Sequence, residues 1–175
     1  MRDYREFYRE AKGDLPRIYC DMDGVLGDFM LAAKKATGTT FTQDQSDRHW
    51  KTISNTKNFW SNMPWMRDGK QLWNYIKKYN PHILSAYTIE DPNCKPGKNK
   101  WLRKELGYTQ NFMINLVRRK EKKDFAMKGS DNKKQPAILI DDYPKNVNQF
   151  KAAGGIGILH TSASNTISQL KRLGF

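Results

Sequence analysis

The chain has 175 residues and a net charge of +13, from 31 Lys and Arg against 18 Asp and Glu. A hydrophobic content of 38% and an aromatic content of 12% exclude a disordered chain, and the length suffices for one domain with a small appended subdomain. No apolar run reaches the roughly 18–20 residues of a membrane span. The charged N-terminus lacks the apolar core of a signal peptide, so we expect a cytoplasmic protein.

Strand-like and helix-like segments alternate along the chain. Short hydrophobic runs predict five buried strands, at 17–20, 82–85, 112–116, 137–140 and 155–159. Apolar spacing and end signals predict helices at 68–80, 99–107, 144–155 and 162–175. Asp68 is the expected N-cap of the first of these helices, and Gly107 the expected C-cap of the second. The alternation is typical of an α/β domain with a parallel sheet covered on both faces.

One segment interrupts this alternation. Residues 28–67 carry no strand signal and are rich in aromatic and polar side chains. Such a length is too great for a structureless loop in a compact domain. We therefore interpret 28–67 as a small helical cap, inserted after the first strand of a core domain formed by 1–27 and 68–175.

Polar residues end three of the predicted strands. Asp21 ends the first strand with Asp23 just beyond, Ser85 ends the second, and Asp141 and Asp142 end the fourth. Because the carboxyl ends of parallel strands share one edge of a sheet, these side chains should converge there. Four carboxylates so close would raise one another's pKa unless a cation were present. Hard oxygen ligands suit Mg²⁺.

A phosphoryl-transfer chemistry follows from this set. One carboxylate can act as a covalent nucleophile that forms an aspartyl-phosphate, and a second can move the proton. A hydroxyl and nearby backbone N–H groups could bind the phosphate oxygens. Each piece alone has a structural alternative, because Asp-x-Asp-Gly is often a turn and Asp-Asp is often a helix N-cap. The order and placement of the pieces together favour the catalytic interpretation.

The motifs resemble, in order, the four motifs of the haloacid dehalogenase superfamily of phosphatases. They are "DMDGVL" at 21–26, "ILSA" at 83–86, a lysine within "RRKEKKDFA" at 118–126 and "ILIDD" at 138–142. Further segments are similar to the 5′(3′)-deoxyribonucleotidase family: "DMDGVLGDF", "FW" at 59–60, "K..W" at 98–101 and "GGIGILH" at 154–160. The resemblance implies a Rossmann-like core with a five-stranded parallel sheet and a small helical cap after the first strand.

The resemblance also implies roles for the carboxylates. Asp21 would be the nucleophile and a Mg²⁺ ligand. Asp23 would be the general acid and base, with its backbone carbonyl on the metal. Asp141 and Asp142 would hold Mg²⁺, and the sequence leaves open which of them binds it directly.

Phosphate binding falls, by the same resemblance, to Ser85, Ala86 and one lysine of the third motif. Lys120, Lys122 and Lys123 all precede the apolar pair at 125–126, and we favour Lys122 by its spacing.

Aromatic residues of the cap match positions that hold the nucleobase in this family. They are Phe29, Phe59 and Trp60, and the alternative is that they form the cap's own core. We expect a Mg²⁺-dependent phosphatase that hydrolyses nucleoside monophosphates. The charge of +13 leaves two alternatives, a 3′-phosphatase acting on nucleic-acid ends and a non-enzymatic nucleic-acid-binding protein.

Overall fold

The computed structural model describes residues 15–41, 46–131 and 134–175. Five strands form one parallel sheet in the order β3-β2-β1-β4-β5. Their bounds are β1 Ile18–Cys20, β2 His82–Ala86, β3 Ile114–Val117, β4 Ile138–Asp141 and β5 Ile156–Leu159. The predicted α/β class is confirmed. The third strand begins later than predicted because Asn111–Met113 form a 3-10 turn.

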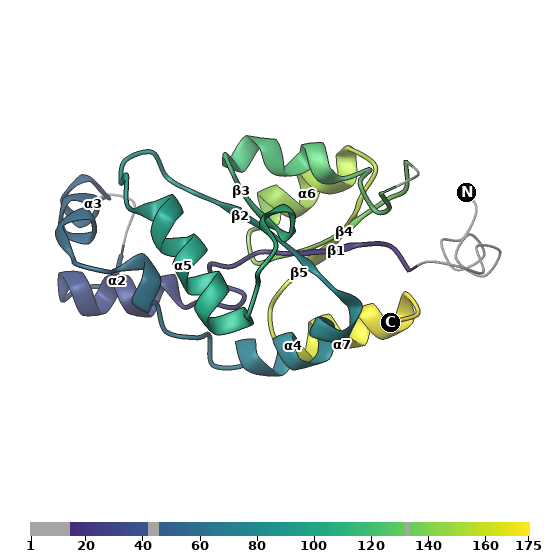
Figure 1. The fold of residues 1–175 in the computed structure, drawn as a ribbon, viewed down its shortest axis with the longest axis horizontal. Coiled ribbons are helices and arrows are strands. Elements are labelled where there is room, and N and C mark those ends of the chain that lie inside the picture. Colours follow the sequence, from purple (N-terminus) through teal and green to yellow (C-terminus); the bar gives the residue numbers. More distant parts are fainter. Residues whose placement is uncertain (1–14, 42–45, 132–133) are drawn as a thin grey trace.

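Helices cover both faces of this sheet. They are α4 Gly69–Ile76, α5 Cys94–Leu106, α6 Pro144–Ala152 and α7 Ala163–Arg172, with a 3-10 helix, η5, at Arg119–Phe125. Figure 1 shows α4 and α7 side by side below the sheet and α6 above it. Side chains of β1 alternate between the two layers, since Ile18 and Cys20 join the core cluster that includes α4 and α7, whereas Tyr19 packs with Phe150 of α6.

The predicted cap contains helices in the part of the chain that the structure describes. They are α2 Phe29–Thr37, α3 Ser46–Asn55 and a short 3-10 helix, η2, at Trp60–Asn62. Figure 1 places α2 and α3 beyond the end of β1, on the side toward which that strand runs. The cap therefore lies next to the carboxyl edge of the sheet. Its boundaries at 28 and 67 stay a prediction.

Helix α5 begins at Cys94, five residues before the predicted start at 99. Pro96 and Gly97 made the sequence predict a later start for this helix. Proline is nevertheless tolerated in the first turn, because the backbone N–H groups of that turn have no hydrogen-bond partner within the helix. A side chain at 97 would place its Cβ 2.5 Å from the Cβ of Trp60, so the glycine allows α5 to lie against η2. The helix ends at Gly107 with φ +72°, as predicted.

Asp68 occupies the N-cap position of α4, but its carboxylate makes no capping bond to that helix. It accepts instead from the backbone N–H of Ala163, the first residue of α7, at 2.6 Å. One carboxylate thus fixes the start of α7 against the start of α4. No helix in the described part of the chain is long and apolar enough to cross a membrane.

Candidate active site

Three carboxylates meet at the carboxyl edge of β1 and β4. These strands are parallel neighbours, with Cys20 opposite Ile140, so Asp21 and Asp141 leave the sheet side by side. Oxygen atoms of Asp21, Asp141 and Asp142 all lie within 4.8 Å of one another. The edge also borders a cavity of about 470 Å³, lined by Asp21, Asp23 and Asp142 among others.

Gly24 lets the chain turn away under this cluster. It has φ +74°, a conformation that favours glycine, and a Cβ there would lie 2.1 Å from Oδ2 of Asp142. The glycine of the first motif is therefore needed both for the backbone turn and for the position of Asp142.

Lys122 compensates the charge of the cluster. Its Nζ lies 2.8 Å from Oδ2 of Asp21 and 2.6 Å from Oδ2 of Asp141, and the side chain is buried. Lys120 and Lys123 are exposed. The 3-10 helix η5 thus directs Lys122, the lysine favoured by its spacing in the sequence, into the protein. The phosphate-binding role of Lys122 stays a prediction.

The carboxylates of this cluster differ in their electrostatics. Burial opposes the charge of Asp21, but attraction and a hydrogen bond from Lys122, with Lys98 and Ser85, hold its pKa below the ordinary value. Burial and repulsion from Asp21 raise the pKa of Asp141 to about 6 and that of Asp142 to about 7. Asp21 is therefore the carboxylate best kept ionised, as a nucleophile must be.

The donor set fits a hard divalent cation. Three carboxylates offer oxygen atoms within one small space. Burial and repulsion from Asp21 raise the pKa values of Asp141 and Asp142, and a bound cation would relieve that repulsion. Asn146 donates its Nδ2 to both oxygens of Asp141, at 3.1 and 3.0 Å, and fixes the orientation of that carboxylate. Asp21, Asp141 and Asp142 are the residues that would hold Mg²⁺, with the backbone carbonyl of Asp23 as the further ligand implied by the resemblance.

Asp23 forms an ion pair with the buried Lys98, a residue to which the sequence analysis assigned no role. Nζ of Lys98 lies 2.5 Å from Oδ2 of Asp23 and donates to the carbonyl of Ala86 at 2.6 Å. Burial raises the pKa of Asp23, with Lys98 opposing and Asp21 adding to the effect. The other oxygen, Oδ1, is buried without a hydrogen-bond partner among the described residues. A protonated Asp23 could therefore donate into the cavity, as a general acid does.

Ser85 and Ala86 end β2 beside these carboxylates. The Ser85 side chain is fully buried, its hydroxyl lies 3.5 Å from Nζ of Lys98, and it helps to hold the pKa of Asp21 below its ordinary value. Ala86 lines the cavity. In this arrangement Ser85 supports the nucleophile, and its contact with phosphate stays a prediction.

Aromatic rings form the cap side of the cavity. Phe29 stacks on Trp60, with ring centroids 5.7 Å apart, and Trp50 lies parallel to Trp60 at 6.3 Å. Phe29, Trp60, Trp50 and Phe41 line the cavity, whereas Phe59 lies behind them with its ring edge-on to Trp60. Trp50 and Phe41 carried no motif, and only the folding of the cap brings them to the wall.

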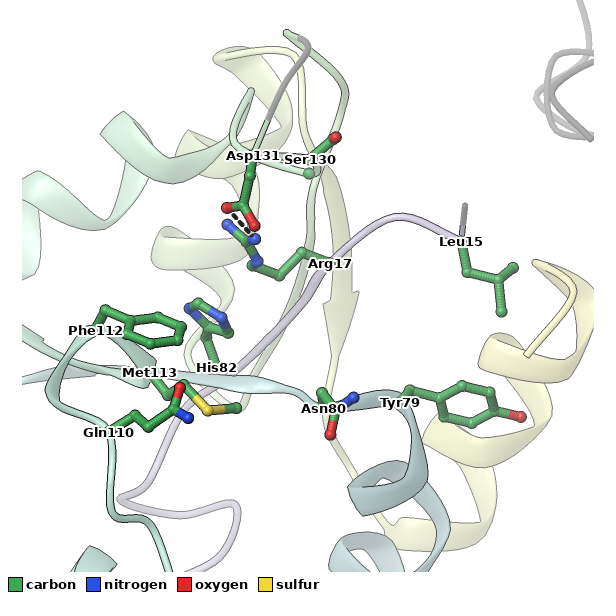
Figure 2. A pocket seen from close by; sticks show the side chains of 11 residues that line it. Leu15, Arg17, Tyr79, Asn80, His82, Gln110, Phe112, Met113, Ser130 and Asp131 are labelled. Carbon is green, nitrogen blue, oxygen red and sulfur yellow. Dashed lines mark hydrogen bonds and ion pairs between the residues drawn. The ribbon is translucent and has the colours of Figure 1, made fainter. Parts of the chain in front are cut away.

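A second cavity of about 570 Å³ lies at the opposite edge of the sheet. Figure 2 shows that Arg17, which precedes β1, and His82, which begins β2, both belong to its lining. Arg17 is ion-paired with Asp131, and Phe112 is largely exposed at this site. This cavity is larger, but none of the clustered carboxylates lines it, so the carboxyl edge is the candidate active site.

Comparisons with known proteins give a likeness in fold. Neither a protein-family model nor a curated protein matches the sequence. A hydrolase from Streptococcus pneumoniae TIGR4 aligns over 90% of this chain and 99% of its own, with a TM-score of 0.55 and 14% identity. A protein assigned as a beta-phosphoglucomutase from Bacteroides vulgatus aligns over 98% of this chain and 93% of its own, with a TM-score of 0.53 and 15% identity.

At such low identity the likeness establishes the fold and nothing finer. Neither of these two structures is described as a nucleotidase, so the resemblance to the deoxyribonucleotidase family rests on the sequence motifs. The chain has a Rossmann-like α/β fold with a five-stranded parallel sheet, as predicted, and its fold is similar to that of both solved structures.

Proposed function

We propose that this protein is a metal-dependent phosphomonoesterase of the haloacid dehalogenase type, acting on nucleoside monophosphates. One observation carries the proposal. An ionised, buried Asp21, paired with Lys122, lies in the lining of a cavity whose other wall is made of aromatic rings. Phosphoryl transfer needs the first part, and stacking of a nucleobase suits the second.

In the first half-reaction Asp21 is the nucleophile. Its carboxylate oxygen attacks phosphorus, the bond from phosphorus to the ester oxygen breaks, and an aspartyl-phosphate forms. Asp23, whose pKa burial raises, gives its proton to the departing alcohol oxygen.

In the second half-reaction Asp23 takes a proton from water. The oxygen of that water attacks the phosphorus of the aspartyl-phosphate, which releases inorganic phosphate and restores the carboxylate of Asp21. Lys122, which lies between Asp21 and Asp141, stabilises negative charge on the transferring group throughout. Mg²⁺, when bound by Asp21, Asp141 and Asp142, would neutralise phosphate oxygens and orient them.

Phosphate release from a panel of deoxyribonucleoside and ribonucleoside 5′- and 3′-monophosphates tests the proposal. We expect turnover with Mg²⁺, loss of turnover with EDTA, and loss in Asp21→Asn, a change that keeps the shape of the side chain. A matched control is Asp124→Asn, because Asp124 is an exposed carboxylate on η5. Phosphate release that persists unchanged in Asp21→Asn would refute the assignment of the nucleophile, and no release from any monophosphate would refute the function.

A further inference from the structure

One cation in the lining of the active-site cavity, and two that contact a lining residue from beside it, are not used by the proposed chemistry. Arg119 lines the cavity, and its guanidinium lies 4.9 Å from the ring centroid of Tyr143, another lining residue. Tyr87, also in the lining, has Nζ of Lys95 at 5.0 Å and the guanidinium of Arg118 at 5.9 Å from its ring centroid. We call these five residues the basic mouth.

The fold brings these residues together from separate elements. Ala86 at the end of β2 pairs with Val117 at the end of β3, and Tyr87 donates its backbone N–H to the carbonyl of Val117 at 3.1 Å. Arg118 and Arg119 therefore leave the sheet beside Tyr87. Contacts between η5 and α6 bring Arg119 to Tyr143, which directly precedes α6.

The three cations of the basic mouth are available to a ligand. All three are exposed, and within the described ranges no carboxylate lies at ion-pair distance from Lys95, Arg118 or Arg119. Glu121 accepts a hydrogen bond from the backbone N–H of Arg118 at 2.8 Å and does not lie at ion-pair distance from its guanidinium. The cations are also held in place, since each lies over a tyrosine ring, which limits the side-chain entropy that binding would cost.

The interior of the cavity differs in charge from its mouth. Its four carboxylates, Asp21, Asp23, Asp141 and Asp142, are already opposed by the buried Lys98 and Lys122, and a divalent cation would balance the rest. The phosphate that reacts would contact Lys122 and this divalent cation inside the cavity. Cations at the mouth are then free to bind a second anionic group.

We propose that the basic mouth is a subsite for a second phosphate group, carried by the same nucleotide that presents its reacting phosphate to Asp21. The inference rests on the proposed function and names the substrate more narrowly. The second phosphate could belong to a free nucleoside 3′,5′-bisphosphate or to the phosphodiester next to the end of a nucleic-acid strand. Both present the same chemistry to guanidinium and ammonium groups.

Binding, measured apart from turnover, tests the inference. In an Asp21→Asn background, calorimetry compares deoxyadenosine 3′,5′-bisphosphate with deoxyadenosine 5′- and 3′-monophosphates. We expect the bisphosphate to bind about tenfold more tightly than either monophosphate. This preference should fall to nearly equal affinities when Lys95→Gln, Arg118→Gln and Arg119→Gln are combined.

The chain offers a matched control for the loss of three charges. Lys77, Lys78 and Lys171 are exposed and lie away from the cavity, and two of them also lie over a tyrosine, Tyr75. Replacing these three by glutamine should leave the preference for the bisphosphate within about twofold of the parent value. Should the triple variant of the basic mouth fail to fold by circular dichroism, Arg119→Gln alone should lower the preference several-fold.

A short oligonucleotide with a terminal phosphate distinguishes the two sources. A strand-end substrate should bind more tightly than the bisphosphate. The slope of log affinity against log salt should fall by about 2 in the triple variant of the basic mouth, at about 0.7 per released contact on a single strand. An oligonucleotide that binds no better than the bisphosphate assigns the site to the free nucleotide.

Two results would be decisive and separate. Equal affinities for bisphosphate and monophosphates, or a preference that survives in the triple variant of the basic mouth, would overturn the second-phosphate subsite. Absence of Asp21-dependent phosphate release would overturn the proposed function, while a binding preference that depends on the basic mouth would still support the subsite.

Discussion

Lys98 is the buried cation whose removal should reveal most about the site. We consider Lys98→Met, which keeps the length of the side chain and removes the charge. The variant loses the ion pair with Asp23 at 2.5 Å and the hydrogen bond to the carbonyl of Ala86 at 2.6 Å. It also loses the contact of Nζ with the ring of Trp60 at 5.2 Å.

The magnitude follows from the burial of the two partners. Breaking a fully buried pair costs about 3–5 kcal/mol, and a surface pair about 0–1 kcal/mol. The Lys98 side chain is 1% exposed but that of Asp23 is 32% exposed, so solvent screens part of the interaction. We therefore expect the free energy of unfolding to fall by about 2 kcal/mol. The loss of Lys98 should also raise the pKa of Asp23 further, since its attraction opposes burial there.

Urea unfolding, followed by tryptophan fluorescence, measures the loss. The double variant Lys98→Met with Asp23→Asn should lose less stability than the sum of the single variants, because each single change removes the same interaction. Lys100→Met is the matched control, as an exposed lysine on the same helix α5. A coupling energy below about 0.5 kcal/mol between Lys98 and Asp23 would refute the reasoning.

Three further outcomes are expected for changes at other residues. Lys122→Met should lower kcat by about 10²–10³, measured in steady-state assays. Lys123→Met, at an exposed neighbouring position, should leave kcat unchanged. Equal effects of the two changes would argue against a catalytic role for Lys122. Gly24→Ala should lower the free energy of unfolding, measured in urea, by at least about 1–2 kcal/mol because of the φ of +74° at this position. It should also raise the Mg²⁺ concentration needed for half-maximal activity, because the new Cβ displaces Asp142. Burial, with repulsion from Arg17, lowers the pKa of His82 to about 4, so the unfolded chain takes up this proton first as pH falls. The stability due to neutral His82 is complete above about pH 6.5 and is lost as the pH falls from there to about 4. His82→Gln should flatten that part of the unfolding profile against pH.

Much of the fold could be predicted from local patterns. A buried parallel strand is a short apolar run in the sequence. For that reason the predicted ends of β1, β2, β4 and β5 lie within two residues of the ends in the structure. The start of α5 was predicted too late, because proline and glycine, here Pro96 and Gly97, usually interrupt a helix. In the folded chain the proline falls in the first turn, where it breaks no hydrogen bond, and the glycine fits against Trp60.

The sequence by itself placed four carboxylates at strand ends, and so determined where this protein concentrates negative charge. It could do so because the carboxyl ends of parallel strands meet at one edge whatever the loops do. Only the tertiary structure decided what surrounds them: Lys98 opposite Asp23, Trp50 and Phe41 in the cavity wall, and the cations of the basic mouth over Tyr87 and Tyr143. Those contacts join residues far apart in the chain, and a lysine or tyrosine has no local pattern that distinguishes a buried partner from a solvated one.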